Sequence, residues 1–96
     1  MGLEREVVFD GPVPPWSAVA AHLSNVQMRM INGNLAAPDE LPEEPWQELR
    51  VAREGEMITL RRLPDRVVLV GWANPTPARQ QLTEDLVRAF TAASQS

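Results

Sequence analysis

Apolar residues along the chain follow two different spacings, and each spacing predicts a different kind of element. The segment 4–10 contains the β-forming run from Val7 to Phe9 and ends at Gly11-Pro12. A short run of this kind, bounded by glycine and proline, is typical of a strand. Residues 4–10 are therefore predicted to form the first strand.

The next apolar residues recur at spacings of three and four, which places them on one face of a helix. This helix would begin near Pro15 and end at Asn32-Gly33-Asn34, because glycine and asparagine adopt the left-handed conformation found at helix C-termini. The predicted face consists of Trp16, Val19, Ala20, Leu23, Val26, Gln27, Met30 and Ile31.

The middle of the chain predicts a long connection followed by three strands. Residues 35–45 carry three prolines and four carboxylates, so we expect them to form the longest connection. Glu54-Gly55 and Pro64-Asp65 then separate runs rich in strand-forming residues and are plausible two-residue turns. The predicted strands are residues 46–53, 56–63 and 66–73.

A second helix is predicted for the last part of the chain. Thr76 supplies an N-cap and Pro77 a first-turn proline. An apolar stripe at helical spacing follows. The stripe consists of Leu82, Leu86, Ala89, Phe90 and Ala93.

The turn at residues 54–55 also predicts a strand register. Antiparallel pairing around it places four aliphatic residues on one face of the hairpin and mostly polar residues on the other. Glu48 then lies opposite Arg61, a favourable pair of opposite charges. The aliphatic pairs are Val51–Ile58 and Leu49–Leu60, and the pairs of the other face are Ala52–Met57, Arg50–Thr59 and Glu48–Arg61.

The last predicted strand determines the expected fold class. Residues 67–70 are consecutive apolar residues, so both faces of this strand need cover. The strand would be interior to the sheet if the first strand lies beside it in parallel. The element order is then β-α-β-β-β-α, with a mixed four-stranded sheet in the order 2-3-4-1. Both helices would cover the aliphatic face, which predicts an α+β two-layer sandwich.

Composition narrows the class of protein. A chain of 96 residues fits one small α+β domain over residues 1–96. The net charge of −4 argues against a protein that follows a nucleic-acid backbone. No apolar run approaches the roughly 18 residues of a membrane span, and no secretory signal follows the charged N-terminus. We therefore expect a cytoplasmic protein with no membrane partner. The absence of cysteine excludes disulfides and cysteine-based zinc sites.

The order α-β-β-β-α over residues 15–93 resembles that of double-stranded RNA-binding domains. In that family the second helix begins with a lysine-rich cluster that contacts phosphates. The matching stretch here, residues 76–81, has Arg79 as its only basic residue and is followed by Glu84 and Asp85. The resemblance is limited to the order of elements, so no family is assigned and no nucleic-acid partner is expected.

Residues that could carry chemistry are few. His22 is the only histidine, and no serine lies in a nucleophile-elbow context, so no catalytic residue is predicted. Acidic residues of the long connection could ligate Ca²⁺ or Mg²⁺, but they lie among prolines and match no EF-hand pattern. A solvated connection is favoured, and no metal or cofactor is expected. The acidic residues are Asp39, Glu40, Glu43 and Glu44.

The last predicted strand also motivates the leading function hypothesis. Under this hypothesis the protein is a small non-catalytic interaction domain or a regulatory domain that acts through protein–protein contact, most simply as a homodimer. With a two-residue turn at residues 64–65, Val68 and Val70 point away from the aliphatic face, whereas a shift of one residue would turn the other pair outward. The candidate interface is Val68, Val70, Trp72 and Met57.

The alternative hypothesis is a small-molecule-binding protein or enzyme with a pocket between the helices and the sheet. Tryptophan anchors interfaces but also seals the rims of cores. Arg61 could hold an anion, although an ordinary surface pair with Glu48 is the simpler interpretation. The candidate pocket rim is Trp16, Trp72, Arg61 and His22.

Overall fold

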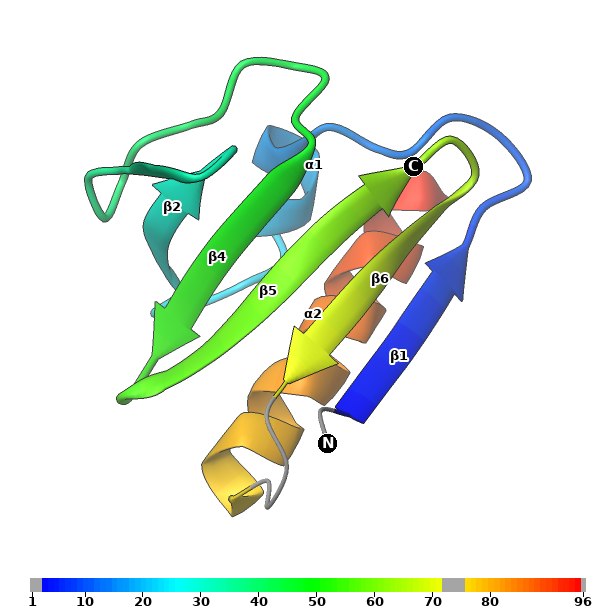
Figure 1. Ribbon diagram of the computed structural model, residues 1–96. Helices are drawn as coiled ribbons and strands as arrows, with labels where there is room; N and C mark the ends of the chain where they lie inside the picture. The colour runs from blue at the N-terminus through cyan, green and yellow to red at the C-terminus, as the bar shows by residue number, and fades with distance from the viewer. Residues whose placement is uncertain (1–2, 72–75, 96) are drawn as a thin grey trace.

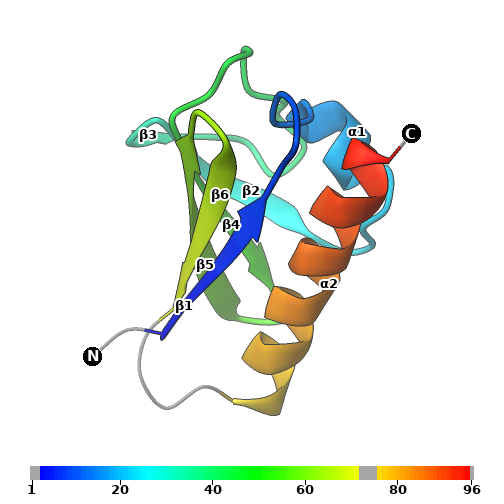
Figure 2. The ribbon, with the colours of Figure 1, turned by 90° about the vertical axis from the view of Figure 1, so that its right-hand side faces the viewer.

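The chain folds into an antiparallel sheet with helices packed on one of its faces (Figure 1). This architecture is seen in a computed structural model that describes residues 3–71 and 76–95. Within these residues the sheet has six strands in the order β1-β6-β5-β4-β2-β3. Figure 2 shows α1 and α2 on the same side of the sheet, as predicted. The elements are β1 (Leu3–Val8), α1 (Trp16–Ala20), β2 (Gln27–Ile31), β3 (Asn34–Leu35), β4 (Glu48–Arg53), β5 (Glu56–Leu63), β6 (Arg66–Gly71) and α2 (Pro77–Ser94).

The meander β4-β5-β6 has the register that the sequence predicts. All five predicted pairs across the turn at residues 54–55 are present. The turn at residues 64–65 places Leu69 opposite Leu60, so Val67 and Leu69 are buried on the helix side. Val68 and Val70 lie on the opposite face and are half-buried. Strand β4 begins two residues later than predicted, and residues 72–73 of the third predicted strand lie outside the described residues.

The prediction of a long first helix is wrong. Helix α1 ends at Ala20, and residues 27–31 form strand β2 instead. Asn25 has a φ of 59°, which a continuing helix cannot accommodate. Asn32 and Gly33 have φ of 50° and 84°, and two consecutive positive values are the signature of a type I′ hairpin turn rather than a helix end. That turn joins β2 to β3.

The prediction of a mixed four-stranded sheet in the order 2-3-4-1 is also wrong. The sheet has two further strands, β2 and β3, and β1 runs antiparallel to β6 rather than parallel to it. The cause is the missing second half of the first helix. In the predicted fold, the first helix returns the chain to the end of the sheet where β1 begins, and the next predicted strand, residues 46–53, runs in the direction of β1. In the structure, β2 already runs in that direction, so β4, β5 and β6 each run opposite to their predicted directions (Figure 1). Strand β6 is nevertheless interior, between β1 and β5.

The element order α-β-β-β-α, on which the likeness to double-stranded RNA-binding domains rests, is therefore not found. Residues 36–47 do form a long connection without helix or strand, as the prolines predict.

The core lies between the sheet and helix α2. Thr76 caps α2 by accepting a hydrogen bond from the Arg79 backbone, and the predicted apolar stripe of this helix is buried. Phe90, fully buried, lies at the centre of an aromatic cluster with ring centroids 6.2 to 6.5 Å apart. Tilted ring pairs at such distances each stabilise the fold by about 0.5–1.5 kcal/mol beyond their buried area. The partners of Phe90 are Phe9, Trp16 and Trp46.

No helix in the described part of the chain is long and apolar enough to cross a membrane.

Candidate interaction surface

The sheet face turned away from the helices carries a mixture of apolar and charged side chains, and we call it the outer face. Alternation along each strand assigns its members, because successive side chains point to opposite faces of a sheet. Neighbouring strands agree, since paired residues share a face. The outer face consists of Glu4, Glu6 and Val8 of β1; Arg66, Val68 and Val70 of β6; Met57, Thr59, Arg61 and Leu63 of β5; Glu48, Arg50 and Ala52 of β4; Gln27 and Met30 of β2; and Leu35 of β3.

Exposed apolar side chains are concentrated on this face. Among the described residues, five large apolar side chains are exposed, and four of the five belong to the outer face. Leu35, at 88% exposed, is the most exposed of them. The half-buried valines of β6 add to this apolar area. The four residues are Val8, Leu35, Met57 and Leu63.

The charges of the outer face balance. Three glutamates and three arginines stand on it, so its net charge is zero, whereas the whole chain carries −4. Arg66 lies 2.8 Å from Glu6, and Arg61 lies 3.4 Å from Glu48. These pairs are exposed and contribute little to stability on their own.

At one end of the outer face, the charges of Arg66, Asp65 and Glu6 are coupled by hydrogen bonds. Arg66 donates hydrogen bonds to both carboxylate oxygens of Asp65 and to Glu6. The hydrogen bond from Arg66 lowers the pKa of Asp65, while the bonds to Asp65 and Glu6 raise the pKa of Arg66. Asp65 and Arg66 therefore keep their charges at neutral pH.

A shallow hollow of about 470 Å³ opens at the other end of the outer face. Its walls include Met30 and Met57 together with the guanidinium-bearing Arg50, which donates to Thr59 at 3.4 Å. Leu35 of the β2–β3 hairpin forms its rim. Methionine is flexible and adapts to the shape of a contacting surface, so this end of the face can accommodate a protruding apolar side chain.

The candidate interface residues lie together as far as the structure describes them. Val68, Val70 and Met57 occupy the outer faces of the adjacent strands β6 and β5. Trp72 lies outside the described residues. Three of the exposed apolar residues of the face, Val8, Leu35 and Leu63, were missed from the sequence. Val8 and Leu63 flank Arg66 and follow from the alternation once β1 is paired with β6, whereas Leu35 required recognition of the Asn32-Gly33 hairpin.

The candidate pocket rim is not assembled. Trp16 is buried against Phe90 in the core, Arg61 is exposed on the outer face, and His22 is exposed in the turn after α1. The sheet therefore separates Arg61 from the other two. Trp72, the fourth member, again lies outside the described residues.

The acidic residues of the long connection do not converge. In the described residues, no group of three or more histidine, cysteine or carboxylate side chains is placed to hold a metal ion. Glu44 instead accepts a hydrogen bond from the backbone nitrogen of Trp16 at 3.2 Å, at the start of α1. Glu40 accepts one from Ala37 within the connection itself.

Comparison of the chain with protein-family models, with curated proteins and with solved structures gives no match. The functional argument therefore rests on the geometry of this chain alone.

Proposed function

We propose that this protein is an interaction domain that forms a homodimer by packing the outer faces of two copies against each other. The observation that carries the proposal is the concentration of exposed apolar side chains on the outer face, which holds four of the five described. Apolar exposure concentrated on one face in this way is typical of contact surfaces in soluble proteins. Two sheets that pack face to face are also an ordinary architecture, with their side chains interdigitating.

The charge distribution favours a second copy as the partner. A two-fold dimer brings the same patch of both chains together, so that patch must be complementary to itself. The outer face is compatible with this condition, because its three glutamates and three arginines balance and two copies would meet without net repulsion. The rest of the chain carries the whole net charge of −4, so contact through other surfaces would bring like charges together.

The size of the face is also sufficient. The strands have two to eight residues, and at about 3.3 Å per residue and about 4.8 Å between strands they outline a face on the order of 500 Å². Two such faces would bury on the order of 1,000 Å² in total, which is near the lower bound for specific interfaces and above the area of most crystal contacts.

Paired charge substitutions on the two faces of β6 test the proposal. In Val68→Glu/Val70→Glu, two carboxylates would be buried without partners in the dimer, at a cost of several kcal/mol. We expect this variant to be a folded monomer. The matched variant Val67→Glu/Leu69→Glu places the same charges in the core and is expected to unfold. Light scattering coupled to gel filtration gives the mass, and circular dichroism gives the fold.

A third variant controls for added negative charge. Gln80→Glu/Thr91→Glu introduces two carboxylates at exposed positions of α2, on the other side of the sheet from the outer face, and should remain dimeric. A wild-type protein that is monomeric throughout the micromolar range would contradict the proposal. So would a folded Val68→Glu/Val70→Glu variant with the mass of the wild type.

A further inference from the structure

A second hollow, of about 290 Å³, lies on the helical side of the molecule, away from the outer face. It is bounded by the connection that follows α1, by the end of β4 and by the middle of α2. Its polar lining consists of His22, Ser24, Arg53, Asp85 and Arg88. One face of it is therefore rich in hydrogen-bond donors.

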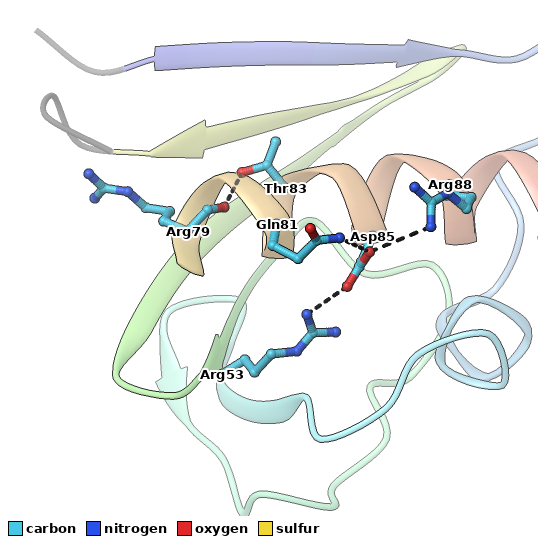
Figure 3. A network of polar contacts seen from close by, with 6 residues as sticks. All are labelled: Arg53, Arg79, Gln81, Thr83, Asp85 and Arg88. Atoms are coloured by element: carbon cyan, nitrogen blue, oxygen red, sulfur yellow. Dashed lines mark hydrogen bonds and ion pairs between the residues drawn. The ribbon is translucent and has the colours of Figure 1, made fainter. Parts of the chain in front are cut away.

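Arg53 is the innermost of these groups. Its side chain is 13% exposed, and its Nη1 donates to Asp85 Oδ2 at 2.7 Å. Figure 3 shows it reaching from β4 toward Asp85 on α2. Its Nε is buried and makes no hydrogen bond to any described part of the chain. The guanidinium is thus fixed in place by Asp85, and its Nε is closed to solvent.

Asp85 is fully engaged by its neighbours. It accepts hydrogen bonds from Arg53 and from Gln81 Nε2, at 2.8 Å, and lies 3.7 Å from Arg88 Nη1 (Figure 3). Arg53 and Gln81 lower its pKa, so the carboxylate is ionised. Since these partners occupy it, Asp85 does not orient His22 as the acid of a hydrolytic triad would.

The charges of the hollow sum to one positive unit. Arg53 and Arg88 contribute two positive charges, and Asp85 removes one. Arg88 is 75% exposed, so its guanidinium is free to turn toward a ligand. A local positive charge on a chain of net charge −4 selects for an anion of charge −1.

The remaining wall of the hollow is apolar. It is formed by Leu23, Ala89 and Ala92, and the two alanines lie one above the other on α2. Small side chains at these positions leave the space open. An aliphatic group of a few carbons would fill it and would be removed from water there.

We propose that this hollow binds a small monocarboxylate with a short aliphatic tail. The planar carboxylate matches the fork of the exposed Arg88 side chain, which can donate two parallel hydrogen bonds to it. The tail would lie against the alanines of α2. A divalent phosphate fits less well, because one of its two charges would remain uncompensated and the apolar wall would face a polar ligand.

Sodium butyrate titrated into the full chain tests this site, at constant ionic strength and with the backbone amide signals followed by nuclear magnetic resonance. We expect saturable shifts at Ser24, Ala89 and Ala92. Butyramide, which has the same shape without the charge, should leave these signals unchanged. Arg88→Gln removes one exposed charge and should weaken butyrate binding at least about tenfold, the effect of one charge-assisted hydrogen bond.

Two further variants make the result specific. Arg5→Gln removes an exposed charge of β1 that belongs neither to the hollow nor to the outer face, and this variant should bind butyrate as the wild type does. Ala92→Leu fills the hollow without changing any charge and should abolish binding. The proposal is overturned if no saturable shift occurs, if butyramide binds equally, if Arg88→Gln binds like the wild type, or if phosphate competes with equal affinity. None of these readouts depends on the outer face, so they stand apart from the dimer test.

Discussion

Asp85 connects helix α2 to the end of strand β4 through an ion pair that is largely shielded from solvent. The side chains of Asp85 and Arg53 are 23% and 13% exposed. The ion pair stabilises the fold mainly because either charge, if buried without the other, would be unfavourable. Removing one partner of a buried charged hydrogen bond exposes the other to the full cost of desolvation.

Asp85→Asn should therefore lower the free energy of unfolding by about 1–3 kcal/mol, because Arg53 loses its ionic partner. Denaturant titration measures the change. Asp10→Asn serves as the control, since Asp10 is exposed in the connection between β1 and α1. Equal stabilities for the two variants would show that the ion pair does not stabilise the fold.

The same substitution predicts a pH dependence. The hydrogen bond from Arg53 holds the pKa of Asp85 below its ordinary value of 3.8 in the folded chain. The carboxylate therefore stabilises the folded state fully above that ordinary value, and the contribution is lost as the pH falls through the lowered one. The difference in unfolding free energy between the wild type and Asp85→Asn should be constant near neutral pH and should narrow in strong acid. A difference that grows in acid would contradict this sign.

At the scale of elements, the hairpin of β2 and β3 is held to the sheet by its turn. Asn32 Oδ1 accepts hydrogen bonds from the backbone nitrogens of Gln47 and Glu48, at 2.8 and 3.0 Å. Its own backbone nitrogen donates to the Glu48 carbonyl at 2.7 Å. One residue thus closes the hairpin and fixes the start of β4.

Asn32→Ala is expected to cost about 2–3 kcal/mol, because it removes two hydrogen bonds and places alanine at a positive φ. Asn32→Gly removes the same hydrogen bonds but tolerates the φ of 50°, so it should cost about 1 kcal/mol less. Thermal or denaturant unfolding distinguishes the two. Asn34→Ala, at an exposed position of β3, should be close to neutral. If the glycine variant were the less stable one, backbone strain would not be part of the cost.

The elements that the sequence predicts correctly are those whose contacts are local. The meander β4-β5-β6 follows from alternation and two short turns, and α2 follows from its cap and its apolar stripe. Residues 26–31 are different, because Val26, Met28 and Met30 also alternate with polar residues. Helical and strand spacing both fit this segment, and only pairing with β4, distant in sequence, decides between them.

The candidate surface was predictable to the same extent. Val68, Val70 and Met57 follow from the register of the meander. Leu35 could be placed only through the hairpin that was interpreted as a helix end.

At the scale of the whole molecule, a dimer would make unfolding depend on protein concentration. For an assembly that dissociates as it unfolds, raising the concentration about 100-fold stabilises the folded state by about 2.7 kcal/mol. For two chains of this size, the melting temperature should rise by about 5–10 °C. Differential scanning calorimetry at two concentrations measures it. The Val68→Glu/Val70→Glu variant should melt at the same temperature at both, and a concentration-independent wild type would contradict the dimer.

The pairing of β1 with β6 has a consequence for how the chain reaches its structure during synthesis. Leu3 lies opposite Gly71, so β1 leaves the ribosome long before its partner strand exists. The two hairpins of the meander close short loops and can form early, whereas β1 must close a loop that spans most of the chain. Strand β1 is therefore expected to dock late. Until it does, the free edge of β6 offers unpaired backbone groups to any other unfinished chain, which concentrates the aggregation risk of this fold in that interval.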